Sequence, residues 1–94
     1  MGIAQIKITD TVKQYSTYED GEAVCREVQK FLPLAETVTV SFENIAGVPS
    51  SFVNGMLNGL IEEIGIDGIK QKIRITHSTR IINDMLRRKF QLSS

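Results

Sequence analysis

The stretch TVTVSFENIAGVPSSFVNGMLNGLIEE, residues 37–63, decides the fold class of this chain. It begins inside ETVTVSF (36–42), a run of β-branched residues bounded by polar ones, which predicts a strand. After the turn ENIAGVP, apolar residues recur every three or four positions from about Ser51 to Ile64. That spacing predicts a helix whose apolar face is broad enough to cover a sheet.

The segment before this stretch predicts another strand and helix. IAQIKIT (3–9) alternates apolar and polar residues as a strand does, and the polar residues 10–21 predict a loop. Helical spacing then begins, with Asp20 as the expected cap of the first turn and Pro33 just after the end.

The segment after it predicts a third strand and helix. Gly65 stands where a helix ends in a left-handed residue, and GIDGIKQ (65–71) predicts a turn. KIRITH (72–77) alternates as a strand. A last helix is expected to open at Ser78 or Thr79, with one apolar face made of Ile81, Ile82, Met85 and Leu86.

This order of elements predicts a single small α/β domain over residues 1–94, with a mostly parallel central sheet flanked by helices. We expect residues 1–18 to form an edge strand and a loop, and residues 19–90 to form the core of the domain. Sites in such sheets tend to form where strands lead into helices, and ENIAGVPSS is one of these turns.

The composition favours a globular protein of the cytoplasm. Hydrophobic residues make up 41% and charged residues 23% of the 94, which is ordinary for a folded soluble domain. No apolar run could cross a bilayer, and the first residues lack the layout of a signal peptide. The lone Cys25 cannot form an internal disulfide, which fits a reducing compartment.

The charges are distributed unevenly, although the formal net charge is zero. Residues 1–69 hold ten acidic against four basic residues, a net charge of −6. Residues 70–94 hold seven basic residues against Asp84, a net charge of +6. Such asymmetry can indicate an anionic partner, but cations at the end of the last helix also suit the helix dipole.

The sequence contains no recognisable motif of a catalytic or metal site. No paired histidines, Cys-x-x-Cys motif, carboxylate cluster or phosphate-binding loop occurs. Cys25 is expected to be a small half-buried side chain, and His77 a residue at the end of a strand with no identifiable acid or nucleophile beside it. We therefore expect no enzyme activity, no metal and no cofactor.

The pair Ser50-Ser51 allows two interpretations. Either serine could cap the helix that follows, a role whose loss costs about 1 kcal/mol. The same helix start offers free amides and a positive dipole end, so a phosphorylated serine would be stabilised there while adding negative charge to the exposed rim.

The stretch 37–63, together with DGEAVCREV before it and IRITHSTRIINDMLRRKF after it, resembles the STAS-like family of bacterial proteins. These are relatives of the sulfate-transporter and anti-sigma-factor-antagonist (STAS) domain, and the resemblance covers about residues 19–90. It implies a sheet flanked by helices and a role in partner switching.

In anti-sigma factor antagonists, a serine at the start of this helix is phosphorylated by a kinase-type anti-sigma factor, which binds only the unmodified form. The resemblance places Ser51 on this phosphoacceptor and Ser50 just before it, with Pro49 where the antagonists usually have aspartate. It implies a histidine-kinase-like ATPase or a serine kinase as partner. The expected docking surface consists of Gly47, Pro49, Ser50, Ser51, Asn54 and Asn58.

Two other functions remain open on the sequence. The amides of residues 50–54 could hold a small anion, which would make the domain a ligand sensor. The basic C-terminal helix, with Arg80, Arg87, Arg88 and Lys89, could bind nucleic acid, but a chain of zero net charge without a reader motif makes this the less favoured interpretation. The sequence leaves the oligomeric state undetermined.

Overall fold

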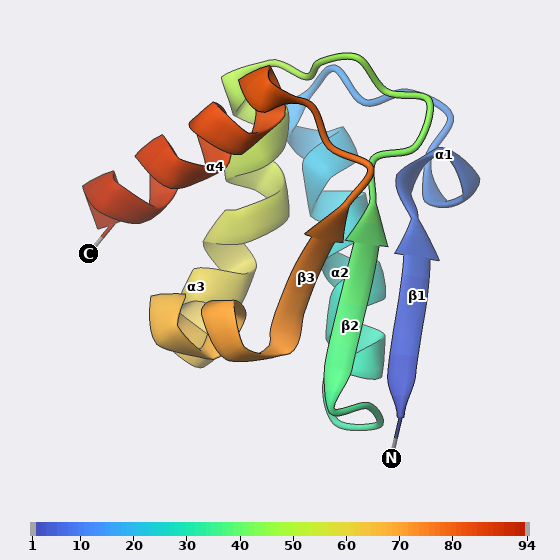
Figure 1. Cartoon of the computed structure of the whole chain (residues 1–94), viewed down its shortest axis with the longest axis vertical. Helices are drawn as coiled ribbons and strands as arrows, with labels where there is room; N and C mark the ends of the chain where they lie inside the picture. Colours follow the sequence, from blue (N-terminus) through green and yellow to red (C-terminus); the bar gives the residue numbers. More distant parts are fainter. Residues whose placement is uncertain (1, 94) are drawn as a thin grey trace.

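The computed structural model of the chain describes residues 2–93 and has the predicted α/β fold. Its elements are β1 (Ile3–Lys7), α1 (Ile8–Thr11), α2 (Tyr18–Phe31), β2 (Thr37–Ser41), α3 (Ser50–Lys72), β3 (Ile73–Thr76) and α4 (Arg80–Ser93). The three strands form a parallel sheet in the order β1-β2-β3, so β1 and β3 are its edges (Figure 1). The predicted small domain with a parallel sheet is confirmed.

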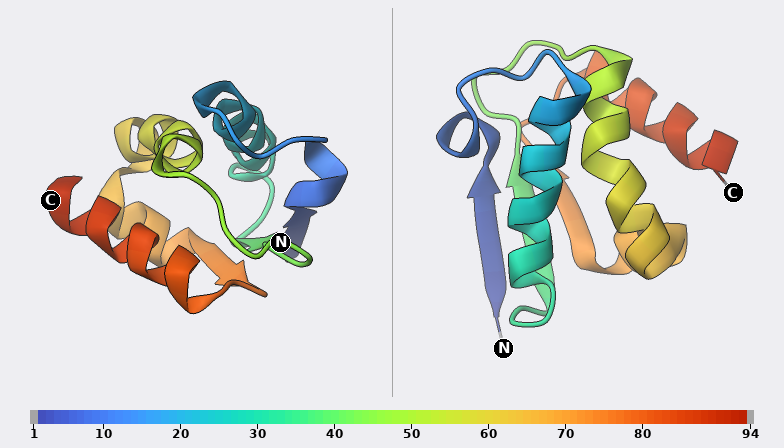
Figure 2. Two further views of the ribbon diagram at one scale, coloured as in Figure 1. Left: turned by 90° about the horizontal axis from the view of Figure 1, so that it is seen from above. Right: turned by 180° about the vertical axis from the view of Figure 1, so that it is seen from behind.

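The sheet has helices on one face only. α2 and α3 lie side by side behind it, and α4 crosses the first half of α3 (Figures 1 and 2). The strand residues that face these helices are buried, among them Ile6, Val38 and Val40. Their neighbours along the strands are polar and point to the uncovered face, which explains the alternation in the sequence.

α2 and α3 pack closely because glycines face each other's backbone. A Cβ atom at Gly21 would collide with the carbonyl oxygen of Phe52, and one at Gly55 with the carbonyl oxygen of Tyr18. The two helix backbones therefore touch with no side chain between them. This contact fixes the N-terminal half of α3 against α2.

The region predicted as a loop, residues 10–21, contains two helix segments. α1 begins directly at the end of β1, and α2 begins at Tyr18 with Thr17 as its cap. Asp20 is therefore three residues inside the cap, and its carboxylate accepts hydrogen bonds from the amides of Ser16 (3.0 Å) and Thr17 (3.1 Å). The Thr17 hydroxyl accepts in return from the Asp20 amide, which makes a capping box.

The predicted turn at 65–71 is also helical. Gly65 does have the positive φ expected of a glycine there, with φ 73°, but its ψ of 171° lies outside the left-handed helical region, and the chain then re-enters a helix up to Lys72. This second segment buries Ile69, and that burial favours a helix over residues 66–72. The sequence does not reveal this, because the glycines of the segment have a low helix propensity. Over residues 2–93, no helix is both long and apolar enough to span a membrane.

Candidate functional site

The turn between β2 and α3 is tightly anchored although its tip is exposed. Phe42, Ile45 and Val48 are buried in the core. The Ile45 amide donates to the Phe42 carbonyl at 3.0 Å, and Asn44 takes a left-handed conformation with φ 67°. Residues 47–51, which we call the serine turn, follow this anchored segment.

The two serines of this turn do not cap α3, contrary to one of the two roles that the sequence allowed. Pro49 is the N-cap residue, with an extended backbone and no side-chain hydrogen bond to the helix. Its carbonyl accepts from the amides of Phe52 (3.1 Å) and Val53 (3.4 Å). Because Ser50 is already helical, its hydroxyl is past the position from which a cap acts. Ser50 is exposed and Ser51 half-buried.

α4 packs beside the serine turn. Its Ile82 is fully buried, and Thr79 caps the helix by accepting from the Ile82 amide at 3.3 Å, so the predicted start is confirmed. The Thr79 hydroxyl also donates to the carbonyl of Ala46 at 3.1 Å, which ties α4 to the loop before the serine turn. Ile81, predicted on the apolar face with Ile82, is instead 62% exposed, because the helix buries a narrower stripe than the sequence suggests.

A surface hollow of about 430 Å³ lies between the start of α3 and α4. On α3 it is lined by Ser50, Val53 and Asn54, and on α4 by Met85, Arg88 and Lys89. It combines a serine hydroxyl, apolar side chains and two cations in one exposed depression. α4 was not part of the docking surface predicted from the sequence, because only the fold brings it to the serine turn.

The remaining predicted docking residues have different surroundings. Gly47 and Pro49 are exposed at the tip of the turn, whereas Asn54 and Asn58 are half-buried along α3. Asn58 donates to the hydroxyl of Tyr18 on α2 at 3.3 Å, so it faces away from the hollow. The six predicted residues thus lie on the serine turn and the first half of α3, but they face different neighbours and do not form a single pocket.

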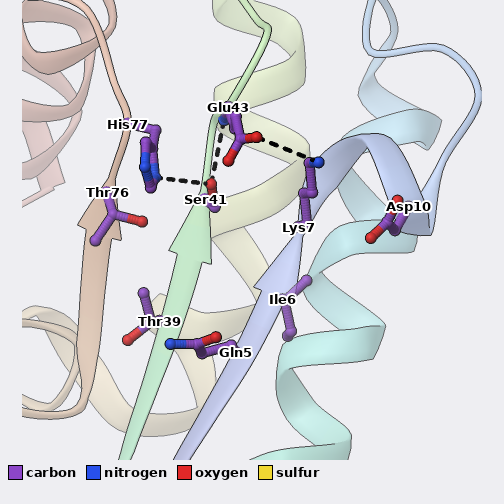
Figure 3. Close-up of a pocket in the computed structure, with 9 residues that line it drawn as sticks. All are labelled: Gln5, Ile6, Lys7, Asp10, Thr39, Ser41, Glu43, Thr76 and His77. Atoms are coloured by element: carbon purple, nitrogen blue, oxygen red, sulfur yellow. Dashed lines mark hydrogen bonds and ion pairs between the residues drawn. The ribbon is translucent and has the colours of Figure 1, made fainter.

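A second polar cluster lies at the carboxyl ends of the strands, on the uncovered face of the sheet (Figure 3). His77 Nδ1 is 3.1 Å from the hydroxyl of Ser41, which accepts from the Glu43 amide at 3.2 Å. The Glu43 carboxylate forms an ion pair with Lys7 at 3.4 Å. These groups line a hollow of about 410 Å³ together with Gln5, Ile6, Asp10, Thr39 and Thr76.

No partner for His77 could be identified from the sequence, and the fold places Ser41 beside it. Ser41 can donate its proton to Nδ1 of a histidine that carries its own hydrogen on Nε2. His77 also has a left-handed backbone, with φ 55°, a conformation that side chains rarely adopt. No carboxylate among the described residues orients the imidazole, because Glu43 is bound to Lys7. The pair therefore lacks the third group of a catalytic triad.

Cys25 is buried against α3, and this burial raises the pKa of its thiol. A buried thiol of raised pKa is a poor nucleophile at neutral pH, which agrees with its expected structural role. Within residues 2–93, no three His, Cys, Asp or Glu side chains converge as metal ligands would.

Comparison with known proteins identifies one family. The sequence profile of a family described as a STAS-like domain of unknown function matches residues 20–82. No curated protein and no solved structure matches the chain. The matched segment runs from the first turn of α2 to Ile82 in α4 and includes the serine turn, whereas β1 and α1 lie outside it.

Proposed function

This chain belongs to the STAS-like domain family, and from that premise we propose that it is a non-enzymatic module that binds a partner protein through the serine turn. The observation that carries the proposal is the state of the two serines. They lie at the start of α3, at an exposed rim, and neither is needed to cap the helix. The turn is nevertheless held in place by buried neighbours, so a partner meets a preformed surface.

The docking surface joins the serine turn to α4. Ile81 is exposed on α4, and Met85, one helical turn further along, lines the hollow beside Ser50. Together with Pro49 they supply apolar area next to the cations Arg88 and Lys89. An apolar centre with a polar rim is the usual arrangement of a protein–protein interface. Arg88 and Lys89 favour a partner whose contacting surface is acidic.

Serine phosphorylation is the proposed control of this docking. A phosphate adds nearly two negative charges, which the free amides and the dipole of α3 would tolerate. It would also cancel most of the positive charge of Arg88 and Lys89 that attracts an acidic partner. Ser51 is the acceptor that the family resemblance implies, whereas Ser50 is the more exposed residue and lies in the hollow with Arg88 and Lys89.

The first experiment is capture of the tagged protein from its own cells at native expression, with mass spectrometry of bait and prey. We expect a histidine-kinase-like ATPase or a serine kinase among the prey, and phosphate on Ser51 or Ser50 of part of the bait. Unmodified bait with no such kinase would contradict the switch.

Charge variants then identify which serine acts. Ser51→Asp should lower capture of the partner while Ser51→Asn, which is similar in size but neutral, preserves it, and the same pair at Ser50 provides the comparison. Equal capture by all four variants would refute phosphorylation control. Circular dichroism of each variant shows whether the helices are intact.

A small-anion sensor is the second candidate, and the two cations of the hollow are the observation that favours it. Inorganic phosphate titrated against the protein should then shift the amide resonances of residues 50–54 and of Arg88.

Nucleic-acid binding through α4 is a separate alternative. It would use the exposed Arg87, whose guanidinium nitrogen lies 3.8 Å from a carboxylate oxygen of Asp84. The affinity for nucleic acid would then fall steeply as the salt concentration rises.

A further inference from the structure

The outer edge of β1 carries unpaired backbone groups whose direction can be derived from two hydrogen bonds. The Gly2 carbonyl accepts from the Glu36 amide at 3.0 Å, on the side of β2. The Lys7 carbonyl accepts from the Thr11 hydroxyl at 3.3 Å, on the opposite side. The amide and carbonyl of one strand residue point to the same side, and the sides alternate along the strand. Ile3, Gln5 and Lys7 therefore direct their backbone groups outward.

α1 occupies one end of this edge and leaves the rest open. It begins where β1 ends and lies beyond the strand, so it takes up the outward carbonyl of Lys7 (Figure 1). The amides and carbonyls of Ile3 and Gln5, and the amide of Lys7, have no strand beside them among the described residues. Such a row is a template for an additional strand.

A groove borders the half of this edge that is nearer to α1. It measures about 370 Å³ and lies between α1 and the second half of α2. Its walls are the edge residues Gln5, Ile6 and Lys7, the α1 residues Asp10 and Thr11, and the α2 residues Glu27 and Phe31. The half-buried Phe31 ring offers apolar surface on the side of the sheet that carries the helices.

The charges of the groove favour a basic ligand. Lys7 is paired with Glu43 at 3.4 Å, and Glu27 with Lys30 at 3.2 Å. Asp10 has no ion pair in the part of the chain that the structure describes, and it also borders the hollow on the uncovered face of the sheet (Figure 3). The carboxylate available to a ligand is therefore that of Asp10.

From this geometry we propose that β1 accepts an extended peptide segment of a partner protein as a fourth strand. Alternate apolar side chains of the segment pack towards Phe31, and the basic side chains between them reach Asp10. Backbone hydrogen bonds between β1 and the segment supply the affinity. The apolar and the basic side chains of the segment supply the selectivity, as in other sheets that are extended by a peptide. Because α1 overhangs one end, the edge is a slot that suits a single strand better than a second copy of this domain.

The test uses a labelled six-residue peptide of alternating valine and arginine with blocked ends, titrated by fluorescence anisotropy against the full chain. We expect saturable binding below about 1 mM. Gln5→Pro removes one outward amide at an edge position that tolerates proline, and it should weaken binding by about tenfold. Gln5→Ala removes the same side chain but keeps the amide, so it should bind more tightly than Gln5→Pro, and the difference between the two variants reports the amide alone. Circular dichroism confirms that both variants are folded.

Two further measurements test the chemistry of the segment. Asp10→Asn should weaken the arginine peptide but not a valine–glutamine peptide of the same length. Absence of binding to the folded wild type up to about 1 mM, or equal binding by Gln5→Pro and Gln5→Ala, would overturn the proposal. Concentration-dependent dimerisation that Gln5→Pro abolishes, without peptide binding, would assign the edge to a second copy instead. None of these results depends on the serine turn.

Discussion

Replacing Gly55 by alanine tests the contact that positions the serine turn. The new Cβ would lie well inside contact distance of the Tyr18 carbonyl oxygen, and that oxygen belongs to helix backbone that cannot rotate away. Overpacking of a core typically costs about 1–3 kcal/mol. Because the Tyr18 backbone cannot shift, the expected cost in Gly55→Ala is about 3 kcal/mol. Alanine returns about 1 kcal/mol through its better helix propensity. The expected net loss is about 2 kcal/mol.

Gly59, one helical turn further along α3, provides the matched control. A Cβ there would lie 3.0 Å from the sulfur of Cys25 and 3.6 Å from the Gln29 side-chain nitrogen, and both are side-chain atoms that can shift. The propensity gain then offsets most of the crowding, so Gly59→Ala should change stability by less than about 1 kcal/mol.

Urea unfolding followed by circular dichroism measures both variants. For a domain of this size, the loss in Gly55→Ala corresponds to a melting temperature lower by about 8–16 °C. A Gly55→Ala variant as stable as the wild type would refute the backbone-to-backbone contact between α2 and α3.

Three more predictions concern the caps and the core. Ser50→Ala and Ser51→Ala should each change the unfolding free energy by less than about 0.5 kcal/mol, since neither serine caps α3; a loss of about 1 kcal/mol in urea unfolding would contradict this. Ile82→Ala should cost about 2–5 kcal/mol by the same measurement, whereas Ile81→Ala should cost almost nothing, and equal losses would mean that α4 is rotated. The backbone hydrogen bond from Ser16 lowers the pKa of Asp20, so its stabilisation is present above the ordinary aspartate pKa and disappears as pH falls through the lower folded value. Urea midpoints of wild type and Asp20→Asn should therefore converge as the pH is lowered below the ordinary aspartate pKa, and a gap that stays constant with pH would count against the capping box.

The sequence predicted the element order and the parallel sheet because each strand alternates and each main helix has an apolar face. It misplaced the start of α2, because Thr17 and Asp20 are both good capping residues and only the geometry shows that they act as a pair. It also missed the helical segment after Gly65, because two glycines in GIDGIKQ suggest a turn when the burial of Ile69 is unknown.

The candidate site was predictable in part. The serine turn could be located because it follows the clearest strand, but the contribution of α4 depends on contacts between residues more than thirty positions apart, such as Thr79 with Ala46. The same holds for Ser41 and His77. One signal was present without being used: Gly55 and Gly59 stand four residues apart inside a helix, where glycine is costly unless a neighbour needs the space.

The parallel sheet also determines how the domain can be attached to something else. All three strands point to the end of the molecule that carries the serine turn, so the start of β1 lies at the opposite end (Figure 1). The intervening helix α2 has 14 residues and a length of about 21 Å. A surface, tag or second protein joined before residue 2 would therefore hold the domain with its serine turn pointing away from the attachment. Immobilised in this way, the domain would present the serine turn to partners arriving from solution.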